Sequence, residues 1–418
     1  MYYKFDNTEL FDGVTRPDFR SFDNNLVIYG AGLQGLLTAH LLKQQGIKVL
    51  CFGDRAENKQ NTTYYGLPVY SPEEMAHRYP DAAAIVTPYT LQSAYEYVRD
   101  ELGYGERTFT PFSLFLEFDS AGFDDLPELP DWYHPESLGY TIAVFMRKCV
   151  NVETTHSLLS AFVFVTEACN LRCKNCLYLI PCYQKPQHYD YDIVLRDLTT
   201  LLKGRKFQHI FLVGGETLLW KPLPRLIRAL CEASEVMECH VVTNGTVFPG
   251  PELLEALQHP KAAVRISDYG ALSKKDRLIP LLQENHIRYW VQLQRWYELS
   301  TFRKKPLSGD AYERVINACC HLGGGGNKYL VDGKLFHCAS QAHLHQLGIY
   351  RSDEKDYVNL RDEDQEYVQR RITEFMDVKH MPPAPGLCRH CDGRGYTGVE
   401  VPPAQQLAPG EKIRVRFE

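Results

Sequence analysis

The residues of this sequence best placed to do chemistry are three cysteines on one short segment. Cys169, Cys173 and Cys176 form a C-x3-C-x2-C pattern soon after the apolar stretch 161–165, which predicts a buried strand. Three thiolates on one tight loop can bind three irons of a cubane and leave the fourth iron open to another ligand. A structural zinc site would need a fourth ligand, and the nearest candidate, Cys182, follows a proline in a different turn. The spacing therefore favours an iron–sulfur cluster.

Further candidate site residues follow three predicted strands downstream, at 209–213, 239–242 and 263–266. The carboxyl ends of parallel strands carry the sites of α/β barrels, so we expect these residues to surround one site. Glycines among them allow the backbone to approach a ligand closely. The residues are Gly214, Gly215 and Glu216 after the first strand, Thr243 and Asn244 after the second, and Ser267 after the third.

Over roughly residues 160–300 these motifs resemble the radical S-adenosylmethionine (SAM) superfamily. The resemblance implies that the three cysteines hold a catalytic [4Fe–4S] cluster and that its open iron binds SAM. It also implies that Glu216, in a GGE motif, hydrogen-bonds the SAM amino group, and that the other strand-end residues contact ribose or carboxylate. Many members carry an aromatic residue just before the third cysteine. This chain has Asn175 there, with Tyr178 as the candidate substitute for shielding the adenine.

A second set of cysteines lies in the last quarter of the chain. Cys338 and the C-x2-C pair Cys388 and Cys391 are joined by Cys319 or Cys320, of which Cys320 gives the closer match in spacing. The pattern resembles the auxiliary-cluster domains called SPASM and twitch, and implies a second [4Fe–4S] cluster at Cys320, Cys338, Cys388 and Cys391. Four cysteines suit zinc equally well, so a zinc ribbon is the alternative.

A glycine-rich turn near the N-terminus predicts a nucleotide site. Residues 26–29 read as a buried strand that leads into Gly30, Gly32 and Gly35 and then into a helical pattern. The glycines allow a pyrophosphate to approach the helix N-terminus. Asp54 lies about twenty residues farther on, where a Rossmann unit places its ribose-binding acid. The alternative is a docking or scaffolding domain with an empty crevice.

The composition restricts the partners. The 418 residues carry 46 basic and 52 acidic side chains, a net charge of −6, which gives no support for general binding to nucleic acid or to an anionic membrane. The N-terminal residues lack the basic start and apolar run of a secretory signal, so we expect a cytoplasmic protein. Thirteen cysteines in that compartment should stay reduced, and clustered ones are then expected to bind metal.

We expect an α/β architecture in which a small twitch-like iron–sulfur domain follows a partial (β/α)6 radical SAM barrel. The expected parts are a Rossmann-like half domain at 20–115, a connector at 116–155, the barrel at 156–305, the cluster domain at 306–400 and a tail at 401–418. The N-terminal part resembles the half-Rossmann domains that accompany polysaccharide-building proteins.

The resemblance implies reductive cleavage of SAM to a 5′-deoxyadenosyl radical that abstracts hydrogen from a substrate, with an electron donor such as flavodoxin or ferredoxin. We expect a small-molecule substrate, a carbohydrate or nucleotide-linked sugar, by analogy with radical SAM proteins of polysaccharide loci. A maturase of ribosomal peptides is the enzymatic alternative. A non-catalytic iron–sulfur or zinc scaffold is the other, and the presence of all three motifs argues against it.

Overall fold

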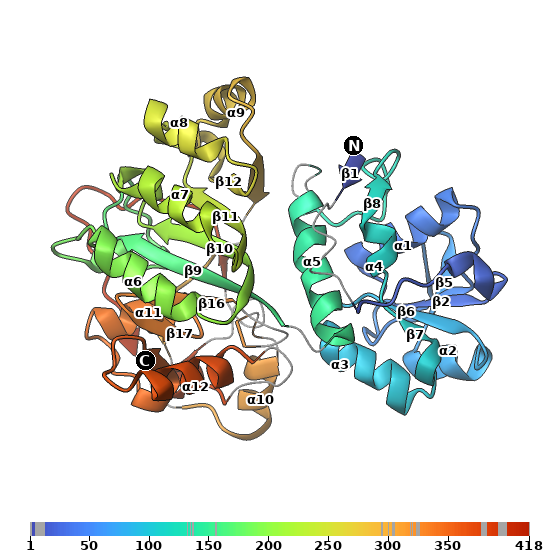
Figure 1. Ribbon diagram of the computed structural model, residues 1–418. Helices are drawn as coiled ribbons and strands as arrows, with labels where there is room; N and C mark the ends of the chain where they lie inside the picture. The colour runs from blue at the N-terminus through green and yellow to red at the C-terminus, as the bar shows by residue number, and fades with distance from the viewer. Residues whose placement is uncertain are drawn as a thin grey trace. The chain divides into compact units, whose positions relative to one another are not determined.

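The computed structural model describes residues 2–4, 13–131, 133, 135, 138–154, 157–293, 296–299, 301–302, 306–317, 319, 321–322, 327–377, 383–391 and 399–417 (Figure 1). The chain divides into two compact units, Met1–Ser157 and Leu158–Glu418. Within the described ranges, no helix combines the length and apolar character needed to cross a membrane.

The first unit is an α/β layer built on a six-stranded sheet. The strands of the sheet follow the order β4-β5-β3-β2-β6-β7, and all neighbours are parallel except β4 and β5. The unit contains β1 (Tyr2–Lys4), β2 (Leu26–Tyr29), α1 (Leu33–Gln44), β3 (Cys51–Gly53), β4 (Thr62–Tyr64), β5 (Leu67–Tyr70), α2 (Pro72–Arg78), β6 (Ala83–Val86), α3 (Leu91–Glu96), β7 (Thr108–Phe109), α4 (Phe112–Phe115), β8 (Glu117–Asp119) and α5 (Leu138–Glu153).

The order in which successive strands join the sheet changes direction at β2. The glycine turn that follows β2 therefore lies at a topological switch point. From β2 the sheet runs to β3 and β5 on one side and to β6 and β7 on the other. Ligands of open α/β sheets bind in the crevice at such a point, outside the carboxyl ends of the strands. Gly30, directly after β2, therefore lies where a Rossmann-type ligand would be held.

The second unit contains the cysteine motifs. It comprises β9 (Leu158–Thr166), α6 (Tyr191–Leu202), β10 (Lys206–Gly214), α7 (Leu223–Glu232), β11 (Val236–Thr243), α8 (Pro251–Leu257), β12 (Ala262–Asp268), α9 (Lys275–Glu284), β13 (Tyr289–Leu293), β14 (Trp296–Tyr297), β15 (Thr301–Phe302), α10 (Gly309–Asn317), β16 (Lys328–Val331), β17 (Lys334–Phe336), α11 (Ala339–Gln346), β18 (Tyr357–Asn359), α12 (Gln365–Phe375), β19 (Glu400–Val401) and β20 (Arg416–Phe417).

Its main sheet is the partial barrel expected from the sequence. The strand order is β13-β12-β11-β10-β9-β16-β17-β18, and β9 to β13 are all parallel. β16 continues the parallel part by pairing with β9, and β17 and β18 add an antiparallel edge. The part of the chain between Cys319 and Cys388 thus extends the barrel sheet with β16, β17 and β18.

The two faces of this sheet differ in chemistry. Alternate residues of the strands, such as Val163, Leu212 and Val241, pack with helices α6 to α9 and α12 in one buried apolar core (Figure 1). The intervening residues carry aromatic and polar side chains, among them Phe162 and Phe211, whose rings stack at 4.6 Å. The face that carries these aromatic and polar side chains is therefore the interior of the partial barrel.

Candidate catalytic site

The three cysteines lie on the loop that follows β9. This strand is buried along its whole length and ends at Thr166, whose Oγ1 accepts a hydrogen bond from the N–H of Ala168 over 3.1 Å. Cys173 is buried, and Cys169 and Cys176 are partly buried. Burial, together with a smaller contribution from the neighbouring thiol of Cys176, raises the pKa of Cys169 to about 12. The three sulfurs thus form one group that is largely withdrawn from water.

Only the thiolate form of cysteine binds iron, and burial alone opposes that form. Burial raises the pKa of Cys173 to about 11 and that of Cys176 to about 12. The positive charge of bound iron is what deprotonates thiols in such surroundings. Backbone and amide N–H groups add local stabilisation, since Leu171 N donates to Cys169 Sγ at 3.4 Å. The surroundings of the loop are therefore more compatible with thiolates bound to metal than with free thiolates.

Gly214 and Gly215 are required for the loop to lie against the end of β10. A Cβ on Gly214 would lie 2.7 Å from the carbonyl oxygen of Thr166, and one on Gly215 would lie 2.4 Å from the carbonyl oxygen of Ala168 and 2.8 Å from Cys169 Cβ. Backbone atoms cannot move aside as flexible side chains do. The glycines thus bring the β10 end and the cluster loop into direct contact, whereas the sequence analysis expected them to allow close approach of a ligand.

Glu216 connects β10 with β11 through its carboxylate. Oε1 accepts hydrogen bonds from Thr243 Oγ1 at 2.8 Å and Leu218 N at 3.1 Å, and Oε2 accepts one from Asn244 N at 2.8 Å. The residue is 1% exposed. Burial raises the pKa of Glu216 to about 7, and these three hydrogen bonds oppose that rise. A carboxylate has about four acceptor positions, so one remains for a ligand.

Asn244 extends this network to the cysteine loop. Its Nδ2 donates to Asn170 Oδ1 at 3.1 Å and approaches Cys169 Sγ at 3.9 Å. Its backbone oxygen and that of Ser267 both accept from the Ser273 hydroxyl at 2.9 Å. Glu216, Thr243, Asn244 and Ser267 are therefore connected by hydrogen bonds, and this set reaches Cys169 through Asn244.

Aromatic residues line the other side of the loop. Tyr178 packs edge-on against Phe164, with ring centroids 5.3 Å apart. The sequence analysis did not select Tyr269, although it stands directly after β12. Burial raises the pKa of Tyr269, and the nearby Cys176 thiol adds to that rise. Trp296 lies against it, with ring centroids 5.4 Å apart. Tyr178, Tyr269 and Trp296 are thus the described aromatic candidates for contacts with an adenine.

The C-terminal segment expected to be a tail packs on the cluster loop. Gln406 Nε2 donates to Cys173 Sγ at 3.2 Å, and Gln406 Oε1 accepts from Arg172 N at 2.7 Å. Backbone hydrogen bonds of 2.8 Å run from Lys174 N to Gln405 O and from Leu407 N to Arg172 O. No periodicity in residues 401–418 indicated this contact.

A comparison of the sequence with known protein families agrees with this geometry. Residues 163–267 match the family model described as the Radical SAM superfamily. Cys169, Cys173, Cys176 and Glu216 all lie within this match, so the chain contains a radical SAM domain. Domains of this superfamily use SAM and a [4Fe–4S] cluster as cofactors. No curated protein matches it with significant sequence similarity.

Solved radical SAM structures give weaker likenesses. BtrN in complex with AdoMet and 2-DOIA is 14% identical with a TM-score of 0.36, over 53% of this chain and 87% of BtrN. anSMEcpe with bound AdoMet and Cp18Cys peptide is 18% identical with a TM-score of 0.26, over 32% of this chain and 42% of that one. SuiB of Streptococcus suis bound to S-adenosylmethionine is 16% identical with a TM-score of 0.27, over 54% and 49%. The match thus covers less than half of SuiB and of the anSMEcpe chain in that complex, and these likenesses give no information about the substrate of this protein.

Outside the radical SAM motifs, the second cysteine set also comes together. Burial raises the pKa of Cys388. The thiols of Cys338, Cys319 and Cys391 also raise it, with contributions that decrease in this order. Cys338 caps the N-terminus of α11, where its sulfur accepts from Gln341 N at 3.3 Å. Cys320 lies outside the described residues, so its predicted role is untested. Cys319 is the described residue of that pair, and it lies near Cys388.

In the first unit, two of the three glycines are needed by the fold itself. A Cβ on Gly35 would lie 2.0 Å from the Gly30 carbonyl oxygen. Gly30 has φ +110°, and a Cβ there would lie 2.7 Å from Thr87 Oγ1. Gly32 differs, because a Cβ there would meet no atom within 4 Å. The open space of this turn therefore lies at Gly32.

Asp54 contacts the glycine turn directly. Its Oδ2 accepts from Ala31 N at 2.8 Å and from Lys59 Nζ at 3.3 Å, and its Oδ1 accepts from Ala56 N at 2.9 Å. Lys59 Nζ also donates to Ala31 O at 2.7 Å. The carboxylate predicted to bind ribose thus anchors the turn, with one acceptor position left for a ligand hydroxyl.

Proposed function

We propose that this protein is a radical SAM enzyme that removes a hydrogen atom from a carbohydrate or a nucleotide-linked sugar. When bound, SAM and the reduced cluster supply the deoxyadenosyl group that takes the hydrogen. The observation that carries the catalytic part is the Glu216 carboxylate, which joins the ends of β10 and β11 beside Cys169. This carboxylate holds the ends of β10 and β11 next to each other, beside the cysteine loop.

The chain's own residues have separate tasks in this proposal. Cys169, Cys173 and Cys176 would hold three irons. Gly214 and Gly215 keep the backbone close to them, since any Cβ there would overlap the loop. The remaining acceptor position of Glu216 suits the SAM ammonium group, and a cation beside it would favour the ionised carboxylate. Positioning and exclusion of water are the protein's contribution to such chemistry.

The first unit supports a nucleotide-linked substrate. Gly32 is the N-cap of α1, at the topological switch of the sheet, and faces open space. Lys59 is 41% exposed at its side chain and already contacts the glycine turn, so it supplies a positive charge for a phosphate. A diphosphate next to Gly32 would have both the helix N-terminus and this ammonium group as partners.

The second cysteine set supports an auxiliary [4Fe–4S] cluster at Cys338, Cys388 and Cys391, with Cys319 or Cys320 as the fourth ligand. Oxidation of an alcohol carbon requires one hydrogen atom to pass to the deoxyadenosyl group and one further electron to leave the substrate. A four-thiolate cluster can accept that electron, while the hydroxyl proton passes to water or a base.

Two measurements test SAM cleavage and the class of substrate separately. Anaerobic, reduced wild-type protein with SAM should release 5′-deoxyadenosine without substrate, and Cys173→Ala should abolish that release. Unchanged release in Cys173→Ala would contradict the catalytic assignment. Thermal shifts with nucleotide sugars and with short peptides then report the substrate class, because a ligand that binds only the folded state stabilises it.

Gly32→Val isolates the role of the first unit. The valine should remove stabilisation by nucleotide sugars and turnover of them, and should leave uncoupled deoxyadenosine release unchanged. Gly250→Val is the matched control, since Gly250 is also a helix N-cap at which an added Cβ would meet no atom within 4 Å. Stabilisation by peptides alone, or Gly32→Val with undiminished turnover, would reject the sugar nucleotide and favour the peptide maturase.

A further inference from the structure

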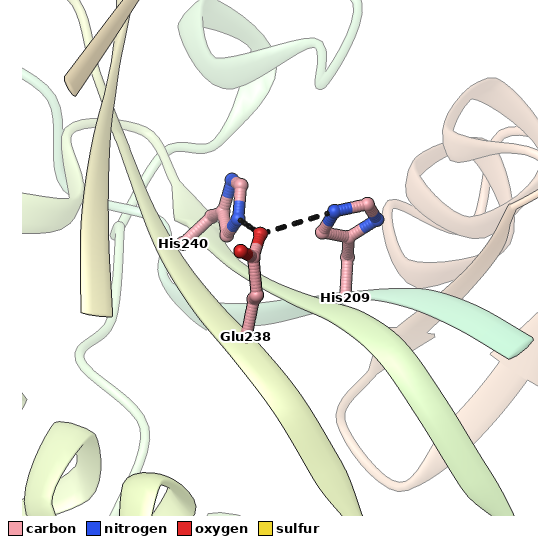
Figure 2. A group of neighbouring side chains, drawn as sticks. All are labelled: His209, Glu238 and His240. Atoms are coloured by element: carbon pink, nitrogen blue, oxygen red, sulfur yellow. Dashed lines mark hydrogen bonds and ion pairs between the residues drawn. The ribbon is translucent and has the colours of Figure 1, made fainter. Parts of the chain in front are cut away.

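A second group of metal-ligating side chains lies on the interior face of the barrel sheet. His209 is in the amino-terminal half of β10, and Glu238 and His240 are in β11 (Figure 2). His209 is five residues before Gly214, about 16 Å along an extended strand. The group is therefore distinct from the cluster site at the carboxyl ends of the same strands.

Strand pairing accounts for the juxtaposition. In the parallel register of β10 and β11, His209 is the partner of Glu238, and Phe211 is the partner of His240. Glu238 and His240 are two residues apart, so their side chains point to the same face. Figure 2 shows the two imidazole rings on either side of the carboxylate. Three ligands, two imidazoles and one carboxylate, of the types that zinc prefers thus converge on a rigid scaffold.

We propose that His209, Glu238 and His240 form a binding site for one divalent transition-metal ion of the zinc class. Glu238 Oε2 lies 2.7 Å from His240 Nε2 and 3.3 Å from His209 Nε2. The three ligand atoms all lie within 4.8 Å of one another. Zinc bonds of about 2.0–2.1 Å in tetrahedral geometry place ligand atoms roughly 3.3 Å apart. To complete the site, the Glu238 and His240 ligand atoms would move apart by about 0.6 Å, and the ligand atoms farthest from each other would close from at most 4.8 Å to about 3.3 Å.

The protonation states suit a metal. Burial raises the pKa of Glu238, but hydrogen bonds from His209 and His240 outweigh it and hold that pKa well below the usual range. Burial lowers the pKa of His240, which disfavours the charged form of this ring. A neutral imidazole can bind an ion through Nε2 and keep its proton on Nδ1, so metal binding changes the tautomer and releases no proton.

Neighbouring residues fix the orientation of the ligands. Arg288 Nη1 donates to the other carboxylate oxygen, Glu238 Oε1, at 2.9 Å. The His240 ring stacks on Trp290 with centroids 4.9 Å apart and planes 9° apart. Such outer contacts orient ligands in metal sites. Arg288 is 42% exposed, so solvent screens its charge from a bound cation. Three protein ligands leave a fourth position open, as in zinc sites that bind a substrate or water.

The test uses Zn²⁺ as the probe and the full-length anaerobic holoprotein. Wild-type protein should bind one zinc per chain in chelator competition. X-ray absorption at the zinc edge should give nitrogen and oxygen neighbours at about 2.0–2.1 Å, and not the sulfur distance of about 2.3 Å expected from the cysteine sets. Because this edge detects only zinc, the iron clusters do not interfere.

Glu238→Gln should weaken zinc binding by more than about tenfold, the smallest loss typical even of residues that only orient ligands. His209→Gln, on the other strand, should do the same, so the test stands if one variant fails to fold. His259→Gln is the matched control, since His259 is an exposed histidine outside the group. No bound zinc, zinc with sulfur neighbours only, or full affinity in both folded variants would show that the three residues are a hydrogen-bonded network only.

Discussion

Gln406 donates its side-chain N–H to the sulfur of Cys173 across 3.2 Å, although the two residues are 233 positions apart in the chain. The same amide accepts a hydrogen bond from Arg172 N at 2.7 Å, so its orientation is fixed at both ends. An N–H donor to a ligating sulfur stabilises the more negative, reduced cluster and raises its reduction potential.

Gln406→Ala should therefore lower the midpoint potential of the catalytic cluster. A net hydrogen-bond contribution of about 0.5–1.5 kcal/mol corresponds to roughly 20–65 mV for one electron. Anaerobic redox titration followed by electron paramagnetic resonance measures the shift. Gln405→Ala is the control, because Gln405 contacts the loop through its backbone oxygen. An equal shift in both variants would assign the effect to the segment and not to the Gln406 amide.

The iron content should report two clusters. Anaerobically reconstituted wild-type protein should hold about eight irons and eight sulfides, as two cubanes require. Replacing Cys169, Cys173 and Cys176 together by alanine should leave about half, and replacing Cys388 and Cys391 should remove the other half. Retention of zinc in place of iron at the second site would contradict the auxiliary cluster and leave the first one intact.

Gly215→Ala should abolish assembly of the catalytic cluster. The added Cβ would lie 2.4 Å from the Ala168 carbonyl oxygen and 2.8 Å from Cys169 Cβ, and the loop would have to move away from β10. Iron content and deoxyadenosine release should both fall, the second to background. Gly250→Ala should behave as wild type, since nothing lies within 4 Å of that position. Normal iron content in Gly215→Ala would mean that the loop does not need this close approach.

Stability should fall in acid partly because of His343. Burial lowers the pKa of this residue, which is 0% exposed, to about 3, and its Nδ1 lies 2.8 Å from the Tyr183 hydroxyl. The unfolded chain takes up this proton below its ordinary pKa of about 6.5, whereas the folded chain does not, so stability is lost as pH falls below 6.5. The loss from this one group is roughly 2 kcal/mol at pH 5.

Urea midpoints of the anaerobic protein at pH 5, 6 and 7.5 measure this dependence. His343→Gln should flatten the acid side of the profile, and His259→Gln, at an exposed position, should leave it unchanged. An acid profile for His343→Gln that parallels wild type would show that other groups account for the loss.

The class of fold and the clustering of the site residues could be predicted from the sequence alone. The C-x3-C-x2-C spacing follows an apolar strand, and Glu216 and Asn244 also stand at strand ends, so parallel pairing alone brings Cys169, Glu216 and Asn244 to one edge. The glycine turn at Gly30 was predictable for the same reason, because strand, turn and helix are local in the chain.

The residues that surround that loop, and the other groups that the barrel holds, could be identified only from the three-dimensional structure. The Gln406 contact joins segments without a shared local pattern, and Cys319 comes near Cys388 through the fold of the C-terminal part. Glu238 and His240 share a face by strand alternation, which a sequence can indicate. The position of His209 beside them depends on the register between β10 and β11, which is set by packing of the whole sheet and not by local residue preference.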